Sequence, residues 1–219
     1  ILYLPEQHMA DRDFVAVAPG CAGEPMEHIL GRLTQAGYTP RVYEDYKEML
    51  RAEKPDVAIV DNYYAQHAEA ILEAFAAGCH VLSDKPVAAD IPELERVEAA
   101  WRKAGTCFAA MFTYRYDGAF YRAWQLVQQG VVGKVRLINT QKSYKLGTRP
   151  AFMHDRKTYG GTIPWVGIHG LEWILWMSGG TLEWVSAVQA AQEAPNGVSP
   201  ETTALVQMRL NDGRMASVT

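Results

Sequence analysis

Two side chains suited to acid–base chemistry stand far apart in this sequence, and the first is a lysine. Lys85 belongs to the tetrapeptide Ser83-Asp84-Lys85-Pro86, which directly follows a short apolar run. A lysine at the end of a buried strand can hold a substrate hydroxyl, or can donate a proton if burial lowers its pKa. Pro86 restricts the backbone of the turn that aims the side chain. A surface lysine before a loop is an equally good interpretation of the tetrapeptide alone.

The second side chain is a histidine at the end of segment 159–169. This segment begins at Tyr159 and contains the pair Gly160-Gly161, which lets the backbone approach a ligand closely. A helix that we expect to begin near Trp165 carries His169 in its first turns. Histidine changes charge near neutral pH, so it is a natural acid or base. The alternative is a hydrogen-bonded histidine of the core.

Polar residues also follow the apolar run 57–60. Asp61, Asn62 and Tyr63 leave its carboxyl end, and a helix begins near His67. In open α/β sheets, ligands bind in the crevice at the carboxyl ends of the strands, and a helix N-terminus attracts phosphate. These residues therefore predict a ligand site, with loop polars and a capping histidine as the alternative.

The elements that must position these residues alternate between strand and helix in the front half. Short apolar runs, typical of buried parallel strands, lie at 14–18, 41–43, 57–60, 80–83 and 108–112. Between them, helical patterns occupy 27–35, 45–52 and 67–77, and a further helix follows Asp90, which has capping-box spacing to Glu93. This alternation predicts βαβ units and a parallel, Rossmann-like sheet over residues 1–113.

The pattern changes after Tyr114. A helix is expected near 117–129 and long strands near 135–144, 182–190 and 203–210, the last followed by a hairpin turn at Asn211-Asp212-Gly213. Polar and apolar residues alternate over 203–210, as in a half-buried antiparallel sheet. We therefore predict an α/β protein whose second, α+β domain, 114–219, has a largely antiparallel open sheet. Arg115 stands at the junction, where it could hold a phosphate or carboxylate in a cleft or form a structural ion pair.

The bulk composition excludes several classes of partner. The net charge of the 219 residues is -4, and no run of Lys or Arg offers a nucleic-acid surface. The most apolar stretch, 171–177, is far shorter than the ~20 residues that span a bilayer. Three widely spaced cysteines, Cys21, Cys79 and Cys107, and the lack of a charged leader before an apolar segment favour a cytoplasmic protein. The opening without Met and the end inside an expected strand suggest that a first strand with a glycine-rich loop, and part of the second domain, lie outside this sequence.

Taken in order, these segments resemble the Gfo/Idh/MocA family of NAD(P)-dependent oxidoreductases. Ser83-Asp84-Lys85-Pro86 is similar to the family's Glu-Lys-Pro motif, and residues 76–82 are similar to the segment that leads into it. Residues 130–135 resemble the turn into the first strand of the second domain, and residues 160–169 resemble the segment that carries the catalytic histidine. Asp84 replaces the usual Glu.

The resemblance implies a hydride transfer between NAD or NADP and a small polyhydroxylated or carbonyl substrate. It implies that Lys85 polarises the substrate and that His169 exchanges a proton with it. It also implies a homo-oligomer formed through the second-domain sheet. By the resemblance and the patterns above, the residues expected to line the cofactor are Asp61, Asn62, Tyr63, His67, Asp84 and Lys85, and those expected to bind substrate are Arg115, Tyr159 and Trp165.

Two positions depart from the family pattern. Pro19 stands where NAD-preferring members often have an acid, so the choice between NAD and NADP stays open. Trp165 stands one helical turn before His169, where the family usually has Asp, and an indole cannot accept a proton. Two alternatives therefore stay open. One is a binding or regulatory relative without redox chemistry, and the other is a lyase or glycosidase without net redox change.

Overall fold

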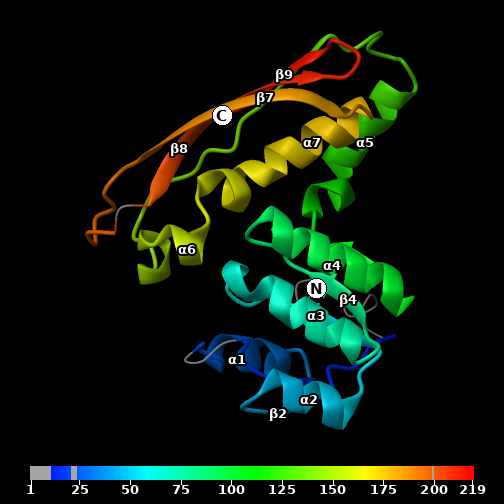
Figure 1. The fold of residues 1–219 in the computed structure, drawn as a ribbon, viewed down its shortest axis with the longest axis vertical. Helices are drawn as coiled ribbons and strands as arrows, with labels where there is room; N and C mark the ends of the chain where they lie inside the picture. The colour runs from blue at the N-terminus through cyan, green and yellow to red at the C-terminus, as the bar shows by residue number, and fades with distance from the viewer. Residues whose placement is uncertain (1–10, 21–23, 199) are drawn as a thin grey trace. The chain divides into compact units, whose positions relative to one another are not determined.

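The computed structural model describes residues 11–20, 24–198 and 200–219. The chain divides into two compact units that meet between Ala110 and Met111 (Figure 1). The boundary expected from the sequence, near residue 113, lies three residues further along. Each unit has its own sheet or sheets.

Unit 1 is built from parallel strands and the helices between them. A two-stranded sheet pairs β1 (Ala16–Val17) with β2 (Arg41–Val42), and a three-stranded sheet has the order β3-β4-β5. Its strands are β3 (Val57–Val60), β4 (His80–Ser83) and β5 (Phe108–Ala110). The helices are α1 (Glu27–Gln35), α2 (Tyr46–Glu53), η2 (Tyr64–Gln66), α3 (His67–Ala76) and α4 (Ile91–Ala104). All strand pairs in this unit are parallel, so the predicted Rossmann-like architecture is confirmed.

Local capping explains where the helices of unit 1 begin. The Asp45 side chain accepts a hydrogen bond from Lys47 N at 2.8 Å, and the Asp90 side chain accepts one from Glu93 N at 2.8 Å. These bonds satisfy backbone donors that have no partner within the helix. Glu93 completes a variant of the predicted capping box, because its carboxylate accepts from Ala89 N rather than from Asp90 N.

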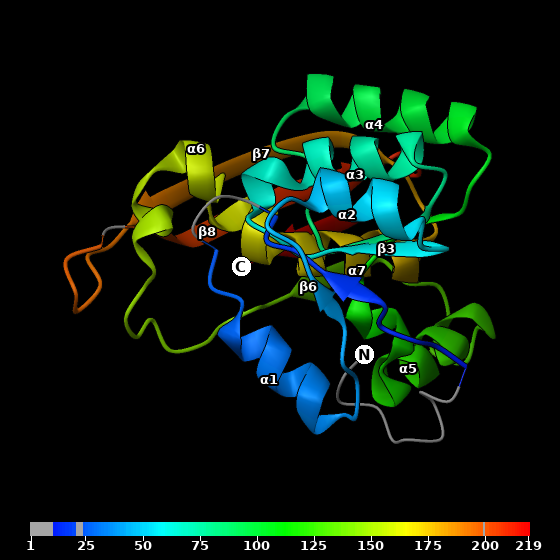
Figure 2. The same ribbon diagram turned by 90° about the horizontal axis from the view of Figure 1, so that it is seen from below.

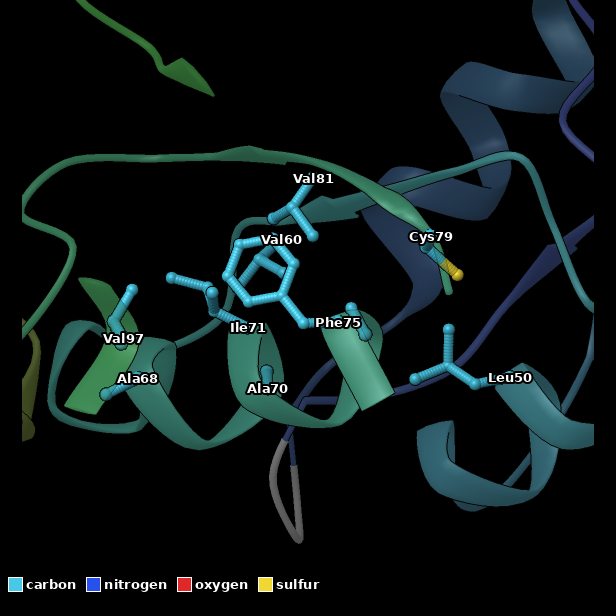
Figure 3. Close-up of a cluster of buried hydrophobic side chains, with 10 residues drawn as sticks. Leu50, Val60, Ala68, Ala70, Ile71, Phe75, Cys79, Val81 and Val97 are labelled. Atoms are coloured by element: carbon cyan, nitrogen blue, oxygen red, sulfur yellow. The ribbon is translucent and has the colours of Figure 1, made fainter. Parts of the chain in front are cut away.

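The core of unit 1 lies between the β3–β4 strands and the helices α3 and α4, which run side by side (Figure 2). The ring of Phe75, on α3, lies against Val60 of β3 and below Val81 of β4, and Ile71 packs beside it (Figure 3). Ile71 is fully buried. Burying one such side chain contributes ~1.5–3 kcal/mol to the stability of the fold. The cluster therefore holds α3 against the sheet, and with it the loops that follow β3 and β4.

Unit 2 contains a mixed four-stranded sheet in the order β6-β9-β8-β7. The strands are β6 (Leu137–Thr140), β7 (Leu182–Ala191), β8 (Glu201–Leu210) and β9 (Met215–Val218). The helical segments are η3 (Thr113–Tyr116), α5 (Gly118–Gln128), η4 (Ala151–His154), α6 (Arg156–Tyr159), the π turn η5 (Ile163–Gly167) and α7 (Ile168–Ser178).

The sheet of unit 2 confirms the prediction of a largely antiparallel sheet but corrects one strand. β7–β8 and β8–β9 are antiparallel, and in β8 the buried residues Val206, Met208 and Leu210 alternate with exposed ones. The long strand expected over 135–144 is wrong, because β6 has four residues. It pairs in parallel with β9, from Leu137 opposite Met215 to Thr140 opposite Val218, and residues 141–144 have no regular secondary structure.

Helix α7 lies along one side of this sheet (Figure 1), and a glycine sets how close it comes. A Cβ at Gly170 would lie 2.6 Å from Thr140 Oγ1 and 2.7 Å from a methyl of Val218. Only glycine fits at such an approach. Ile174, one turn further on, is fully buried against Val206 and Met208 in the same core cluster.

The helices of the described residues are short. α4, with 14 residues, is the longest of them. A bilayer requires ~20 apolar residues in a row. None of the helices in the described ranges has the length and apolarity that a transmembrane span needs.

Candidate functional site

The loops that follow β3 and β4 leave the same edge of the unit 1 sheet. Val60 pairs with Ser83 in register, and Asp84 N donates to Val60 O at 2.7 Å. The two loops therefore start side by side at the carboxyl ends of parallel strands, where α/β proteins bind ligands. Ser83 is fully buried and its hydroxyl donates to Asp84 O at 2.8 Å, which holds the start of the second loop in place.

The imidazole of His67 contacts the backbone of both loops. Its Nδ1 lies 2.7 Å from Pro86 O and its Nε2 lies 2.7 Å from Asn62 O. The residue is 1% exposed, at the first position of α3. From the sequence, His67 is expected to line the cofactor. The structure places its ring beneath the loops, where both nitrogens face backbone carbonyls.

The loop that follows β1 meets the loop that follows β3. Asn62 Nδ2 donates to Gly20 O at 3.4 Å, and a Cβ at Gly20 would lie 2.1 Å from Asn62 Cβ. Gly20 N in turn donates to Glu24 Oε2 at 2.6 Å. Glu24 was missed in the sequence analysis, because nothing in the sequence shows that its carboxylate folds back to the end of β1.

Carboxylates gather around Asp61 at this edge. Although the residue keeps an exposed surface, desolvation of its carboxyl raises the pKa of Asp61. The carboxylate of Asp84 and, less strongly, that of Glu24 raise the pKa further, and the lowering effects of His67 and Lys85 do not cancel them. Lys85 is half-buried and its peptide bond to Pro86 is cis. The edge thus carries one lysine among several acids.

Two tyrosines of the first loop have different surroundings. Tyr64 is 1% exposed and its hydroxyl donates to Ala89 O at 3.4 Å. Tyr63 is half-buried at the N-terminus of η2, and its carbonyl accepts from Gln66 N at 2.8 Å. Of the pair, Tyr63 keeps the more accessible side chain.

In unit 2, His169 stands at the second position of α7, directly after the π turn. π turns are rare and are frequent at functional sites. Its ring centroid lies 5.2 Å from that of Tyr114, and the Tyr114 hydroxyl is hydrogen-bonded to Lys142 Nζ. Gly170, the next residue of α7, lies against Thr140 of β6 and Val218 of β9.

Trp165 lies within the π turn and packs on aromatic rings. Its centroid is 5.9 Å from that of Phe152 and 6.0 Å from that of Tyr159. Tyr159 is 3% exposed, and its hydroxyl donates to Glu201 O at 3.3 Å. Burial raises the pKa of Tyr159, so the phenol stays protonated near neutral pH.

A pocket of about 410 Å³ lies within unit 2. Among the residues that line it are Lys142, Tyr144, Arg149, Tyr159, Val166 and Glu201. The volume falls in the range of small-molecule sites. Gly167 and Val166, two and three residues before His169, belong to its wall, so the pocket lies next to the start of α7.

Arg115 is engaged elsewhere in unit 2. Its Nε donates to the Glu172 carboxylate, and its guanidinium lies 5.8 Å from the ring centroid of Trp176. Glu172 is 7% exposed, so this pair neutralises a buried charge. Arg115 is not among the residues that line the pocket. The structural ion pair, which the sequence analysis held as the alternative, is what the described residues show.

Comparison with known proteins now decides the family. Residues 26–112 match the family model described as "Oxidoreductase family, NAD-binding Rossmann fold", and residues 120–219 match "GFO/IDH/MocA C-terminal domain". This chain belongs to the Gfo/Idh/MocA family. The two matches cover most of the chain.

Relatives of this Gfo/Idh/MocA chain include named dehydrogenases. It is 28% identical to trans-1,2-dihydrobenzene-1,2-diol dehydrogenase of Bos taurus over 77% of this chain and 50% of that protein. It is 29% identical to D-glucoside 3-dehydrogenase of Escherichia coli, over 63% and 40% respectively. A solved Thermotoga maritima structure, provisionally assigned as an oxidoreductase, is 36% identical with a TM-score of 0.91, over 95% of this chain and 64% of that one. The chain spans about half the length of the curated relatives that it matches.

The residues of unit 1 fit the nicotinamide cofactor that the family model names. Asn62 Oδ1 is buried and accepts no hydrogen bond from the described residues, so it can receive one from a ligand hydroxyl or amine. Gly20 brings the loop after β1 to the same place. No group of three or more His, Cys, Asp or Glu side chains in the described ranges could hold a metal ion.

Proposed function

We propose that the protein containing this chain transfers a hydride between a nicotinamide cofactor and a small polyhydroxylated or carbonyl substrate. The observation that carries the proposal is the edge of the parallel sheet, where the loops of Asn62 and Lys85 lie side by side in a matched NAD-binding fold. The cofactor supplies the hydride chemistry, and the protein binds, orients and moves protons. The named relatives are dehydrogenases and so favour neither alternative, a binding relative or a lyase, for which Trp165 is the motivating feature.

Two residues have proposed chemical roles. The ammonium of Lys85 would hold and polarise the substrate oxygen, because it stands at the ligand-binding edge of unit 1. The imidazole of His169 would exchange a proton with that oxygen as its carbon is oxidised or reduced. The family resemblance assigns both residues to the same reaction. Trp165, in place of the usual Asp, would act through packing on Tyr159 rather than through proton transfer.

The relatives support a substrate with neighbouring hydroxyl groups. One is named for a dihydrodiol and the other for a glucoside, and each is a dehydrogenase. The pocket of unit 2 suits a ring of this size, because tyrosine rings and aliphatic side chains line it together with polar groups. Tyr159, one of the predicted substrate residues, forms part of its wall.

We further propose that the cofactor is NAD rather than NADP. Glu24 accepts from Gly20 N at the carboxyl end of β1, and Glu24 and Asp61 are close enough for one carboxylate to act on the other. In Rossmann folds an acid binds the hydroxyls of the adenosine ribose. A 2′-phosphate would meet like charges there. Glu24 thus takes the place of the acid that Pro19 does not supply.

The remaining proposals concern assembly and compartment. Large apolar side chains of the edge strand β7 are exposed, namely Trp184 (46%), Val185 (55%) and Val188 (65%). An exposed apolar edge strand is a surface that proteins usually cover, which supports a homo-oligomer through this sheet. Cys79 and Cys107 are free thiols, in agreement with a reducing, cytoplasmic setting, whereas Cys21 lies outside the described residues.

Calorimetry with NAD and NADP on the wild-type protein and on Glu24→Gln tests the cofactor proposal. We expect NAD to bind more tightly than NADP, and the preference to fall about tenfold in the variant because a repulsive charge is lost. Glu27→Gln, a change of an exposed acid on α1, is the matched control. Failure of both dinucleotides to bind would refute the proposed function. Absorbance at 340 nm with polyol substrates then separates net redox chemistry from binding alone.

A further inference from the structure

The pocket of unit 2 carries an excess of positive charge. Lys142 and Arg149 both line it. The Lys142 ammonium bonds to the Tyr114 hydroxyl, and the Arg149 guanidinium donates to Lys145 O at 3.4 Å and lies 5.5 Å from the ring centroid of Tyr144. These partners are neutral, and within the described ranges neither cation has a carboxylate at ion-pair distance. The chain as a whole carries a net charge of -4, so the positive charge of this pocket is opposite in sign to that of the whole chain.

The acid in the pocket wall is already neutralised in part. Glu201 Oε1 lies 3.6 Å from Arg156 Nη1, and the Glu201 side chain is 24% exposed. Its other oxygen, Oε2, is buried and receives no hydrogen bond from the described residues. The hydroxyl oxygen of Thr202, also in the wall, is buried without a partner in the same sense. Buried acceptors of this kind are completed by a donor such as a ligand hydroxyl.

The rest of the wall suits the body of a ring. Tyr144 and Tyr159 contribute aromatic faces, and Met153 and Val206 are buried apolar residues of the lining. Stacking on tyrosine orients a sugar or cyclohexene ring without adding charge. The pocket therefore offers three kinds of contact, namely a cationic pair, unpaired hydrogen-bond acceptors and an apolar surface.

The cationic side of the pocket is connected to His169. Lys142 bonds to the hydroxyl of Tyr114, and the ring of Tyr114 lies 5.2 Å from the imidazole of His169, centroid to centroid. Lys142 Nζ also lies 5.0 Å from the Tyr114 ring centroid. One side chain therefore separates the cation from the proposed proton-exchanging residue, which makes the pocket the natural place for the substrate's non-reacting part.

We propose that this pocket binds a small hydroxylated carboxylate, such as a sugar acid, rather than a neutral sugar. Lys142 and Arg149 would hold the carboxylate, and Glu201 Oε2 and Thr202 Oγ1 would accept from its hydroxyls. Charge-assisted bonds to two cations favour an anion over an isosteric neutral group. This inference rests on the proposed function, because it takes the ligand of the pocket to be the substrate of the oxidoreductase.

Calorimetry without any dinucleotide tests the proposal separately from hydride transfer. The probes are D-glucuronate and D-glucuronamide, which differ by a carboxylate against a neutral amide of nearly equal size. We expect the wild-type protein to bind glucuronate at least ~10-fold more tightly at low salt, and this preference to shrink at 1 M salt. Lys142→Gln and Arg149→Gln should each reduce the preference several-fold, and the double variant should abolish it.

Arg122→Gln is the matched control, since it removes an exposed cation of α5 that does not line the pocket. It should leave the preference unchanged. Thermal unfolding of every variant checks that the fold is retained, and variants that fail to fold are replaced by Lys142→Arg and Arg149→Lys, which should keep the preference. Equal affinity for the two probes, no binding of glucuronate, or the same loss in the control would overturn the proposal. NAD binding that persists in the same protein would leave the oxidoreductase proposal standing.

Discussion

The imidazole of His67 lies between two backbone carbonyls, with Nδ1 2.7 Å from Pro86 O and Nε2 2.7 Å from Asn62 O. One side chain thereby sets the spacing of the loops that carry Asn62 and Lys85. The ring is 1% exposed, so its contribution to a ligand site comes through the positions of these loops. His67, which the sequence suggests as a cofactor ligand, is therefore a positioning residue.

His67→Ala should destabilise the protein and weaken cofactor binding. Loss of the ring leaves at least one loop carbonyl oxygen without its N–H donor, which costs ~1–3 kcal/mol where that oxygen is buried. Denaturant titration should show the loss of stability, and calorimetry well below the unfolding temperature should show weaker NAD binding. His28→Ala, an exposed change on α1, is the control. NAD affinity that stays unchanged in the folded variant would mean that the ring supports stability alone.

Lys85→Met should remove most turnover without changing the fold. Proton transfer or polarisation by a positioned side chain contributes ~10²–10⁴-fold to rate, and Lys85 is half-buried at the ligand-binding edge rather than in the core. Steady-state kinetics on a confirmed substrate give the effect, with Lys103→Met on the exposed face of α4 as the matched control. Near wild-type kcat in Lys85→Met would show that this lysine is a surface charge.

His169 and Trp165 should respond differently to substitution. His169→Ala should lower kcat by ~10²-fold or more, because the proton-exchanging group is lost. Trp165→Phe should chiefly change KM and substrate range, because the indole packs 6.0 Å from Tyr159, centroid to centroid, and Tyr159 lines the pocket. Trp184→Phe, on the exposed strand β7, controls for loss of an indole. Unchanged turnover in His169→Ala would favour a non-catalytic protein.

Asp61→Asn should stabilise the protein at neutral pH and lose this advantage in acid. Burial and the Asp84 carboxylate raise the pKa of Asp61 in the folded state. A carboxyl with a raised folded pKa favours folding below its unfolded pKa, and that contribution is lost as pH rises through the folded value. The amide has no charge to desolvate. The melting temperature of the variant should therefore exceed that of wild type at pH 7, with a smaller difference near pH 4.

Asp13→Asn provides the comparison, since Asp13 is an exposed acid of the same unit. Its melting temperature should follow that of wild type across the pH range. A difference between Asp61→Asn and wild type that is the same at both pH values would show that ionisation of Asp61 has no part in the effect.

Helices and strands with local signals can be predicted from the sequence alone. α1, β3 and β4 have the predicted bounds, because C′ glycines and short apolar runs specify them within a few residues. The Asp90 cap and the alternation of β8 are likewise readable from neighbours in the chain. The motif around Lys85 and the segment ending at His169 indicated the family, because each is a run of neighbouring residues that can be read from the sequence.

Contacts between residues that are distant in sequence could not be predicted and are known from the fold. β6 pairs in parallel with β9, whose paired residues stand 78 positions further along the chain, and no local pattern specifies that pairing. Arg115 is an ion-pair partner because α7 presents Glu172 to it, and His67 is buried because two loops converge on its ring. The carboxylate of Glu24 reaches Gly20, and Lys142 and Arg149 line one pocket. Such contacts carry no periodicity, since each results from packing that local sequence patterns do not encode.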